Sequence, residues 1–388
     1  MENIFELTTK ELKTISNRLQ EKIEEGLEKN GMEILSIPTY ITPSNNILNG
    51  KVLALDWGGT NFRASIVEFK NGKPTVLEIK EKKINADITK NFKQKDLFAV
   101  MAKVISQLKN LDKTVTNIGY CFSYPAKCKT NGDATLLHWA KEIDIPDMVG
   151  KPVGEPFVKY LNNHINTNFK NIKVINDTVA CLFAGLSKTG YDNYIGLIVG
   201  TGTNMASLMR KDKIKKLGSN ESCLIPVNLE SGNFNPPYLT KIDNLVDETT
   251  NNRGAQRFEK AVSGGYLGKI FVKNLYPKKV DYDFDSEILS GLINDSENQI
   301  KTAKNIADRS AKLVAASIAG LAQVIVKQNK NTKKIGLAAD GSVFWKTPNY
   351  KNLVEAELKI LLPNNVSIEV FDKTKDPNLI GAAIAALS

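Results

Sequence analysis

The sequence is poor in the residues that usually build metal centres and disulfide frameworks. Its 388 residues include four cysteines and two histidines, and no two cysteines stand in a CxxC pair. Zinc sites are recognised by clusters of such residues at short spacing, so the pattern predicts none. Thiols without a disulfide framework are typical of reducing compartments, and we expect a cytoplasmic protein.

A signal segment, a membrane-spanning run and a dense basic block are also missing. The N-terminus carries Glu2 and Glu6, and the most apolar helical stretch, 313–326, is too short to cross a bilayer. The formal charge of +10 comes from 52 basic and 42 acidic residues that are spread along the chain. We therefore expect neither a membrane nor a nucleic-acid partner, and a Lys-rich surface that attracts anionic nucleotides.

Two common kinase signatures are absent as well. The sequence has no GxxxxGK[ST] motif, which excludes a P-loop kinase, and no His-Arg-Asp motif, which excludes a protein kinase. If this chain transfers phosphoryl groups, it must bind phosphate through a different motif.

A candidate motif is present in the stretch 53–63, Leu-Ala-Leu-Asp-Trp-Gly-Gly-Thr-Asn-Phe-Arg. An apolar strand reaches Asp56, the chain reverses at Gly58-Gly59, and a second strand leaves. Glycines let backbone amides approach an anion closely, and Asp56 beside them can hold a hydrated Mg²⁺. Taken alone, the stretch is equally well explained as a Gly-rich hairpin turn.

A second copy favours the functional interpretation. The stretch 195–209 is again an apolar strand, a Gly-rich turn and an outgoing strand, and Gly202-Thr203-Asn204 matches the earlier Gly59-Thr60-Asn61. Two short apolar strands, 118–123 and 335–340, extend the duplication. A long repeat present only twice predicts paired α/β domains that face one cleft.

Several further elements follow from local pattern. Thr8 and Glu11 form a capping box, so we expect an amphipathic helix over 8–29, and the apolar spacing predicts helices over 95–109, 302–327 and 379–387. We expect a strand over 75–83, a connector over 31–50 and an exposed excursion over 277–300.

Two segments follow buried strands, where open α/β sheets bind ligands. The polar stretch 123–142 is a candidate substrate loop, with an ordinary surface loop as the alternative. Asp177 stands where a strand passes into a helix. It suits either a helix cap or a carboxylate base, and local sequence alone favours the cap.

Taken together, the ordered motifs resemble the hexokinase family, the eukaryotic-type ATP-dependent hexose kinases of the actin-like ATPase superfamily. The likeness runs collinearly from about Val52 to the C-terminus. It rests on the segments 56–63, 122–125, 139–141, 176–179, 200–204, 258–268 and 340–343.

The resemblance implies an α/β protein with the two-domain actin-like ATPase (ribonuclease H-like) fold, in which duplicated mixed β-sheet domains surround a cleft. It places a small domain at 51–176, with the C-terminal helix 377–388 packing on it. The large domain then comprises 1–50 and 177–376.

The resemblance also implies the reaction, which is transfer of the γ-phosphoryl group of MgATP to the 6-hydroxyl of a hexose, with glucose as first choice. The products are hexose 6-phosphate for glycolysis and ADP. Asp177 would be the general base, assisted by Lys141. The implied hexose contacts are Ser123, Asn176, Asn204, Glu230 and Glu259.

On the nucleotide side, the resemblance implies Mg²⁺ as cofactor with no direct protein ligand, and Asp56 reaches it through water. We expect a monomer or a homodimer. The implied nucleotide-binding residues are Asp56, Gly58, Gly59, Thr60, Asn61, Arg63, Thr201, Gly202, Gly264, Gly341 and Ser342.

Three positions depart from the family pattern. Ala140 stands where the family has threonine, which removes one neutral hydrogen bond to sugar, about 0.5–1.5 kcal/mol. The segment 376–378, Asp-Pro-Asn, replaces a Gly-rich turn with serine, and Trp57 replaces an aliphatic residue.

The alternatives differ in class. Among enzymes, the runner-up is a kinase for mannose, fructose or an amino sugar. A non-catalytic hexose sensor would keep the pocket without needing Asp177 and Lys141. An ATP-driven chaperone or filament of the same superfamily would show ATPase activity without sugar.

Overall fold

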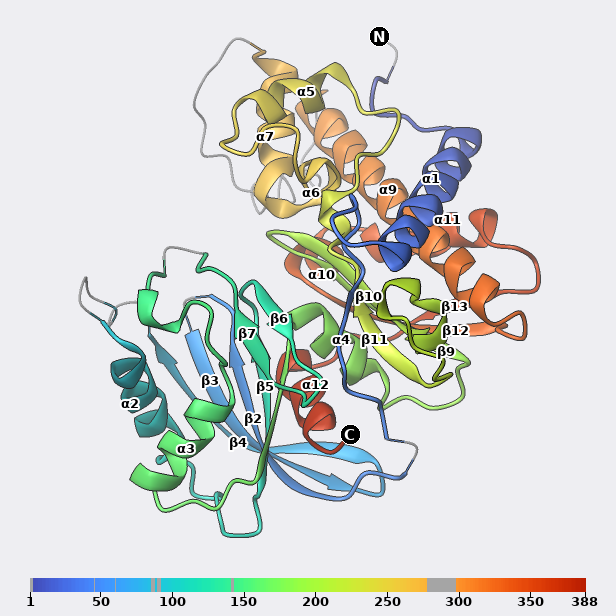
Figure 1. Ribbon diagram of the computed structural model, residues 1–388. Coiled ribbons are helices and arrows are strands. Elements are labelled where there is room, and N and C mark those ends of the chain that lie inside the picture. The colour runs from blue at the N-terminus through green and yellow to red at the C-terminus, as the bar shows by residue number, and fades with distance from the viewer. Residues whose placement is uncertain are drawn as a thin grey trace. The chain divides into compact units, whose positions relative to one another are not determined.

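The computed structural model describes residues 3–44, 46–59, 61–84, 88, 92–140, 143–277 and 298–388 (Figure 1). The chain forms two compact units, and each combines segments distant in sequence. Unit 1 comprises 1–37, 190–222 and 228–373, and unit 2 comprises 38–189, 223–227 and 374–388. The domain boundaries expected at 50/51 and 176/177 remain a prediction. Most of the excursion expected over 277–300 lies outside the described residues.

Unit 2 contains a five-stranded sheet in the order β4-β3-β2-β5-β8. The strands β2 and β3 pair antiparallel, whereas β5 runs parallel to both β2 and β8. The predicted hairpin and third strand are therefore confirmed. The strands are β2 (Gly50–Trp57), β3 (Asn61–Lys70), β4 (Lys73–Lys83), β5 (Asn117–Phe122) and β8 (Asn171–Ile175).

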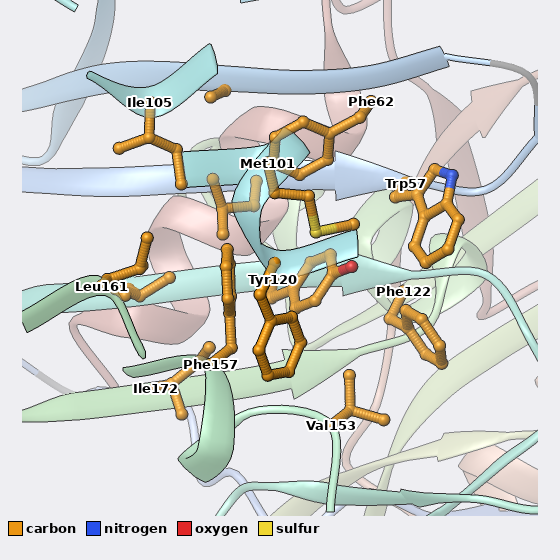
Figure 2. Packing of buried hydrophobic residues seen from close by; sticks show 14 of the residues in the cluster. Trp57, Phe62, Met101, Ile105, Tyr120, Phe122, Val153, Phe157, Leu161 and Ile172 are labelled. Carbon is orange, nitrogen blue, oxygen red and sulfur yellow. The ribbon is translucent and has the colours of Figure 1, made fainter. Parts of the chain in front are cut away.

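Alternation along these strands separates two faces of the sheet. On β2, Leu53, Leu55 and Trp57 belong to a buried cluster with residues of β5, α2 (Gln94–Ile105) and α3 (Glu155–His164). Figure 2 shows Trp57 in this cluster together with Met101 of α2 and Phe157 of α3. The helix predicted over 95–109 is thus present but ends earlier. On the opposite face, α12 (Pro377–Ala386) packs on β2, β5 and α4 (Asp177–Gly185).

The remaining elements of unit 2 are short. A two-stranded sheet pairs β6 (Ala126–Cys128) with β7 (Ala134–Leu136), within the stretch 123–142 that was expected to be a substrate loop. The 3₁₀ helix η2 covers Pro146–Met148. The chain passes between the two units at 37/38, 189/190, 222/223, 227/228 and 373/374, of which the first lies in β1 (Ile37–Pro38) and the fourth in β11 (Leu224–Asn228).

Unit 1 repeats the strand order of unit 2. Here β10 (Thr203–Arg210) pairs antiparallel with β9 (Asn193–Val199), which runs parallel to β12 (Lys334–Asp340). The strand β12 in turn runs parallel to β13 (Ser367–Val370). The order β10-β9-β12-β13 therefore matches β3-β2-β5-β8, and the predicted duplication is confirmed.

Helices complete unit 1 (Figure 1). The capping box of Thr8 and Glu11 forms as predicted and begins α1 (Thr9–Glu28), which packs on α9 (Asn298–Gln328). Among the described helices, α9 is long and apolar enough to span a membrane, but 78% of its most apolar window is buried, as in a core helix. The others are α5 (Lys241–Glu248), α6 (Arg257–Val262), α7 (Gly264–Leu275), α10 (Ser342–Lys346) and α11 (Tyr350–Leu361), and the 3₁₀ helices are η3 (Lys211–Lys213), η4 (Lys215–Leu217) and η5 (Ser231–Asn233).

The close contact between α12 and α4 yields a first prediction. An ideal Cβ at Gly381 would lie 1.9 Å from the carbonyl oxygen of Ala180. We expect Gly381→Ala to lower the free energy of unfolding by about 1–3 kcal/mol, the usual cost of overpacking. This clash outweighs the helix propensity that alanine gains over glycine, about 1 kcal/mol. Urea and thermal denaturation measure the change.

The control for Gly381→Ala is Ala356→Ser, which adds one atom on the exposed face of α11. It should stay within about 0.5 kcal/mol of the wild type. Equal stability of the Gly381 variant and the wild type would show that α12 can move away from α4 without cost.

Candidate active site

The predicted site residues divide between the two units. Unit 2 carries the first hairpin with Ser123, Asn176 and Asp177, and unit 1 carries the second hairpin with the two glutamates. Two predicted residues, Thr60 and Lys141, lie outside the described residues. Each unit is therefore built up separately below.

A pocket of about 450 Å³ opens in unit 2 at the ends of β2 and β5. It brings the predicted base together with predicted phosphate-binding residues of the first hairpin. It also includes Glu81 and Asn378, which the sequence did not single out as site residues. The lining residues are Asp56, Gly58, Gly59, Asn61, Arg63, Glu81, Ser123, Asp177 and Asn378.

The carboxylate of Asp56 is the most buried charge in this pocket. Burial raises its pKa, and the neighbouring guanidinium of Arg63 opposes that rise. Arg63 donates through Nε to Asp56 Oδ2 at 3.0 Å and through Nη1 to Asp376 Oδ1 at 2.8 Å. One guanidinium thus pairs with two carboxylates, and it fixes the geometry of both because its donors are held in a planar fork.

The glycine turn and the predicted sugar residue Ser123 are in direct contact. The backbone N–H of Ser123 donates to the carbonyl of Trp57 at 3.1 Å. An ideal Cβ at Gly58 would lie 2.4 Å from Ser123 Oγ, so no larger residue fits without displacing that hydroxyl. The hydroxyl of Tyr124 also donates to the carbonyl of Gly59 at 3.4 Å.

The junction of β8 and α4 corrects one expectation. The helix cap is Asn176, whose Oδ1 accepts from the N–H of Val179 at 2.8 Å, and not Asp177. Asp177 is the first helical residue, and its Oδ1 accepts from the N–H of Thr178 at 2.8 Å. The interpretation that Asp177 begins a helix and also faces the pocket is consistent with this geometry.

The described part of the chain contains no group of three or more His, Cys, Asp or Glu side chains that could hold a metal ion by themselves. Mg²⁺ usually retains several waters and binds through one or two carboxylates together with substrate phosphates. Two buried acceptors, Asn61 Oδ1 and Asn378 Oδ1, have no hydrogen-bond partner among the described residues, and both side chains line the pocket. Such oxygens can accept from metal-bound water, so the pocket fits a hydrated ion next to Asp56.

The predicted sugar residues of unit 1 are joined by a hydrogen-bond network. The amide of Asn204 donates to Asn228 Oδ1 at 2.8 Å, and Asn228 Nδ2 donates to Glu230 Oε1 at 2.6 Å. Asn204 Oδ1 in turn accepts from the N–H of Ser231 at 3.1 Å. The sequence missed Asn228, although it stands two residues before Glu230 at the end of a strand.

Glu259 lies in the first turn of α6 and contacts the second hairpin. Its Oε2 accepts from the N–H of Thr203 at 3.0 Å. An ideal Cβ at Gly202 would lie 2.6 Å from the same oxygen, so this turn also requires glycine. Burial raises the pKa of Glu259, while the Thr203 N–H and the charge of Lys260 oppose the rise.

The predicted nucleotide residues of unit 1 also lie together. The N–H groups of Gly264 and Gly265, at the start of α7, donate to the carbonyls of Gly200 and Thr201 at 2.7 and 3.0 Å. Gly341, with φ +107°, precedes Ser342 at the start of α10 and packs against Gly200. These bonds and this contact hold three turns together, although the N–H groups of Gly264 and Gly265 are used inside the protein.

Comparison with known proteins gives one consistent result. Two sequence models of the family described as hexokinase match residues 1–186 and residues 194–276 with 286–388. Hexokinase-2 of Schizosaccharomyces pombe is 27% identical over 440 residues, which cover 99% of this chain and 95% of that protein. Hexokinase-1 of Saccharomyces cerevisiae is 28% identical and covers 100% of this chain and 91% of its own.

Solved structures show the same likeness. A hexokinase from Schistosoma mansoni, described as complexed with glucose, has a TM-score of 0.81 at 25% identity over 99% of this chain and 96% of that chain. A second structure described as hexokinase has a TM-score of 0.85 at 24% identity. The latter shows the fold.

The raised pKa of Glu259 yields a prediction about stability. A carboxyl group whose folded-state pKa is raised favours the folded state while it is protonated, and this contribution is lost as the pH rises through the folded pKa. Glu259 therefore stabilises the folded state less at pH 7 than at acidic pH. We expect Glu259→Gln to raise the thermal midpoint at pH 7, and the gain to disappear as the pH falls to about 4.5.

Thermal unfolding between pH 4 and pH 8 tests this expectation, with Glu6→Gln at an exposed position as control. The control should follow the wild type throughout. If the Glu259→Gln variant were less stable than the wild type at pH 7, the raised pKa of Glu259 would be contradicted.

Proposed function

The chain belongs to the hexokinase family and is an ATP-dependent hexose kinase, and we propose that glucose is its preferred acceptor and Asp177 its general base. The observation that carries this proposal is the pocket of unit 2. It places Asp177 beside Ser123 and beside the glycine turn of the first hairpin. A base, a sugar-binding hydroxyl and a phosphate-binding turn in one pocket are the parts that phosphoryl transfer to an alcohol needs.

Each unit contributes polar side chains that suit a sugar. The N-cap role of Asn176 occupies its Oδ1, so we propose that its Nδ2 donates to a hexose hydroxyl. Glu230 and Glu259 are acceptors held by Asn228 and by the Thr203 N–H. A site built to pair several hydroxyls rejects molecules that lack them, because its own polar groups would remain unpaired. Ser123 and Asn204 complete the proposed hexose contacts.

The proposed chemistry is in-line transfer of the γ-phosphoryl group. Asp177 accepts the proton of the 6-hydroxyl as the new O–P bond forms, and the bond to ADP breaks. Backbone amides of the turns at Gly58-Gly59 and Thr201-Gly202 hold the phosphates and stabilise the charge that develops on them. Lys141 is proposed to assist at the transferring group, and the remaining proposed nucleotide contacts are those predicted from the sequence.

Mg²⁺ is the cofactor that we propose. It would be held by Asp56 through water, and it would supply positive charge to the phosphates when bound. The surrounding acceptors Asn61 and Asn378 would receive hydrogen bonds from its waters. Asp56 and Arg63 lie opposite each other on β2 and β3, next to the turn.

We further propose that the protein acts in the cytoplasm, as a monomer or a homodimer, and feeds glycolysis. The basis for the location is the use of cysteine: the sequence has four cysteines and no CxxC pair, and Cys121 is buried. Such thiols persist in a reducing compartment.

The decisive test is ADP release from MgATP with and without a panel of hexoses. We expect release that depends on sugar, with glucose ranked first. Asp177→Ala should lower kcat by at least about 10²-fold, the range that a positioned base contributes, while the hexose Kd changes by only a few fold. Steady-state kinetics and calorimetric titration of the sugar provide the two readouts.

Asp372→Ala is the matched control, since Asp372 is exposed. It should retain wild-type turnover. Hexose binding without turnover in the wild type would favour a sugar sensor, and ATP hydrolysis independent of sugar would favour an ATPase of another kind. If a different sugar ranked first in the panel, the preference for glucose would be refuted, but the proposed kinase reaction would stand.

A further inference from the structure

The carboxylate of Asp56 is held from two sides. Arg63 binds Oδ2 through Nε, and the side-chain amide of Asn378 donates to Oδ1 at 3.3 Å. Both carboxylate oxygens therefore have a donor from a different element, β3 and α12. Arg63 also donates through Nη2 to Oδ2, and the thiol of Cys121 also bonds to this carboxylate, so the Asn378 amide is the contact from α12 that restricts its rotation at Oδ1.

The element that carries Asn378 is itself firmly anchored within unit 2. The helix α12 is buried from Leu379 to Ala386 except at Ile380, and its backbone approaches β5 so closely that an ideal Cβ at Gly119 would lie 1.8 Å from the Ala382 carbonyl. Asp376, just before the helix, is tied to Arg63. The position of Asn378 is thus set by the core and not by its contact with Asp56.

The side-chain oxygen of Asn378 can still accept a hydrogen bond. Asn378 Oδ1 is buried without a hydrogen-bond partner among the described residues, and the side chain lines the pocket. A buried orphan acceptor is costly in a folded protein unless a ligand or water completes it. Asn378 therefore stands between the carboxylate that it orients and the space where a ligand binds.

We propose that Asn378 is a positioning residue, which orients the carboxylate of Asp56 and so makes the first turn of α12 part of the nucleotide site. The inference rests on the proposed function for its readouts. It assigns a role to the segment 376–378, which departs from the family pattern. Asn378 acts through Asp56 and takes no part in proton transfer.

The test uses two variants of the full-length protein that occupy nearly the same space as asparagine. Asn378→Leu removes the donor and the orphan acceptor, and Asn378→Asp removes the donor but keeps a polar group of the same shape. We expect both to lower kcat/KM for MgATP by about tenfold, since hydrogen bonds to charged groups are among the stronger ones. The Kd of MgADP, measured by calorimetry with glucose present, should rise by a similar factor.

A role in packing alone would predict something different. If Asn378 only filled space, the aspartate and leucine variants would bind MgADP like the wild type, and that result would overturn the proposal. Weaker MgADP binding in only one of the two variants would overturn the proposal as well. Such a result would be due to the added charge of aspartate or to the lost polarity of leucine, and not to the missing donor. Should the leucine variant fail to fold, Asn378→Ala takes its place.

Two further readouts separate positioning from general damage. The Kd of glucose should stay close to the wild-type value in both variants, and thermal unfolding should show that both are folded at the assay temperature. Asn171→Leu serves as matched control, because its Nδ2 also donates to a side-chain oxygen, Asn117 Oδ1 at 3.2 Å, at an exposed position of unit 2. It should match the wild type in every assay.

The outcomes distinguish this inference from the proposed function. A wild type that shows no hexose-dependent ADP release but binds MgADP more tightly than both variants refutes the function and supports the role of Asn378. A wild type that turns over glucose normally, with variants that bind MgADP equally well, refutes the role of Asn378 alone.

Discussion

At two turns there is no room for a side chain larger than glycine, and this close packing determines where the candidate site residues lie. In unit 2 a Cβ at Gly58 would collide with the hydroxyl of Ser123, and in unit 1 a Cβ at Gly202 would collide with the carboxylate of Glu259. Each turn therefore holds backbone amides that suit phosphate directly against a side chain that suits sugar. The buried strands before the turns fix this juxtaposition, because a slide by one residue would move each apolar side chain to the other packed face of its sheet.

A carboxylate that is buried at these turns destabilises the folded state, and the two units stabilise it through different partners. Asp56 is paired with Arg63, whereas Glu259 is held by a backbone N–H of Thr203 with Lys260 nearby. In both cases burial raises the pKa of the carboxyl group, because its charged form is less well solvated there than in water. Carboxyl groups with a shifted pKa are concentrated at functional sites, where reactivity comes at the expense of stability. The large apolar cores of the two units offset this loss of stability.

Local pattern predicted the two hairpins, their duplication and most of the pocket in unit 2, because strand and glycine signals are confined to short stretches. It could not predict Glu81. Simple pairing about the turn at 71–72 sets Lys80 opposite Arg63, but an extra residue in β4, Leu77, shifts the register by one and sets Glu81 there. Nor could it predict Asn378, whose hydrogen bond to the pocket spans 322 positions of sequence and depends on how α12 packs.

Trp57 shows why a departure from a family pattern need not alter a site. Neighbouring strand residues face opposite ways, so the residue after Asp56 points into the core, where Figure 2 shows it beside Phe122. Its ring centroid lies 4.9 Å from that of Tyr124 and 5.6 Å from that of Trp139. Its indole N–H has no partner among the described residues, which costs about 1–3 kcal/mol. Several aromatic contacts of about 0.5–1.5 kcal/mol each are enough to offset that cost. The substitution is thus compensated inside the core, and the pocket side of the strand keeps the carboxylate that phosphate chemistry needs.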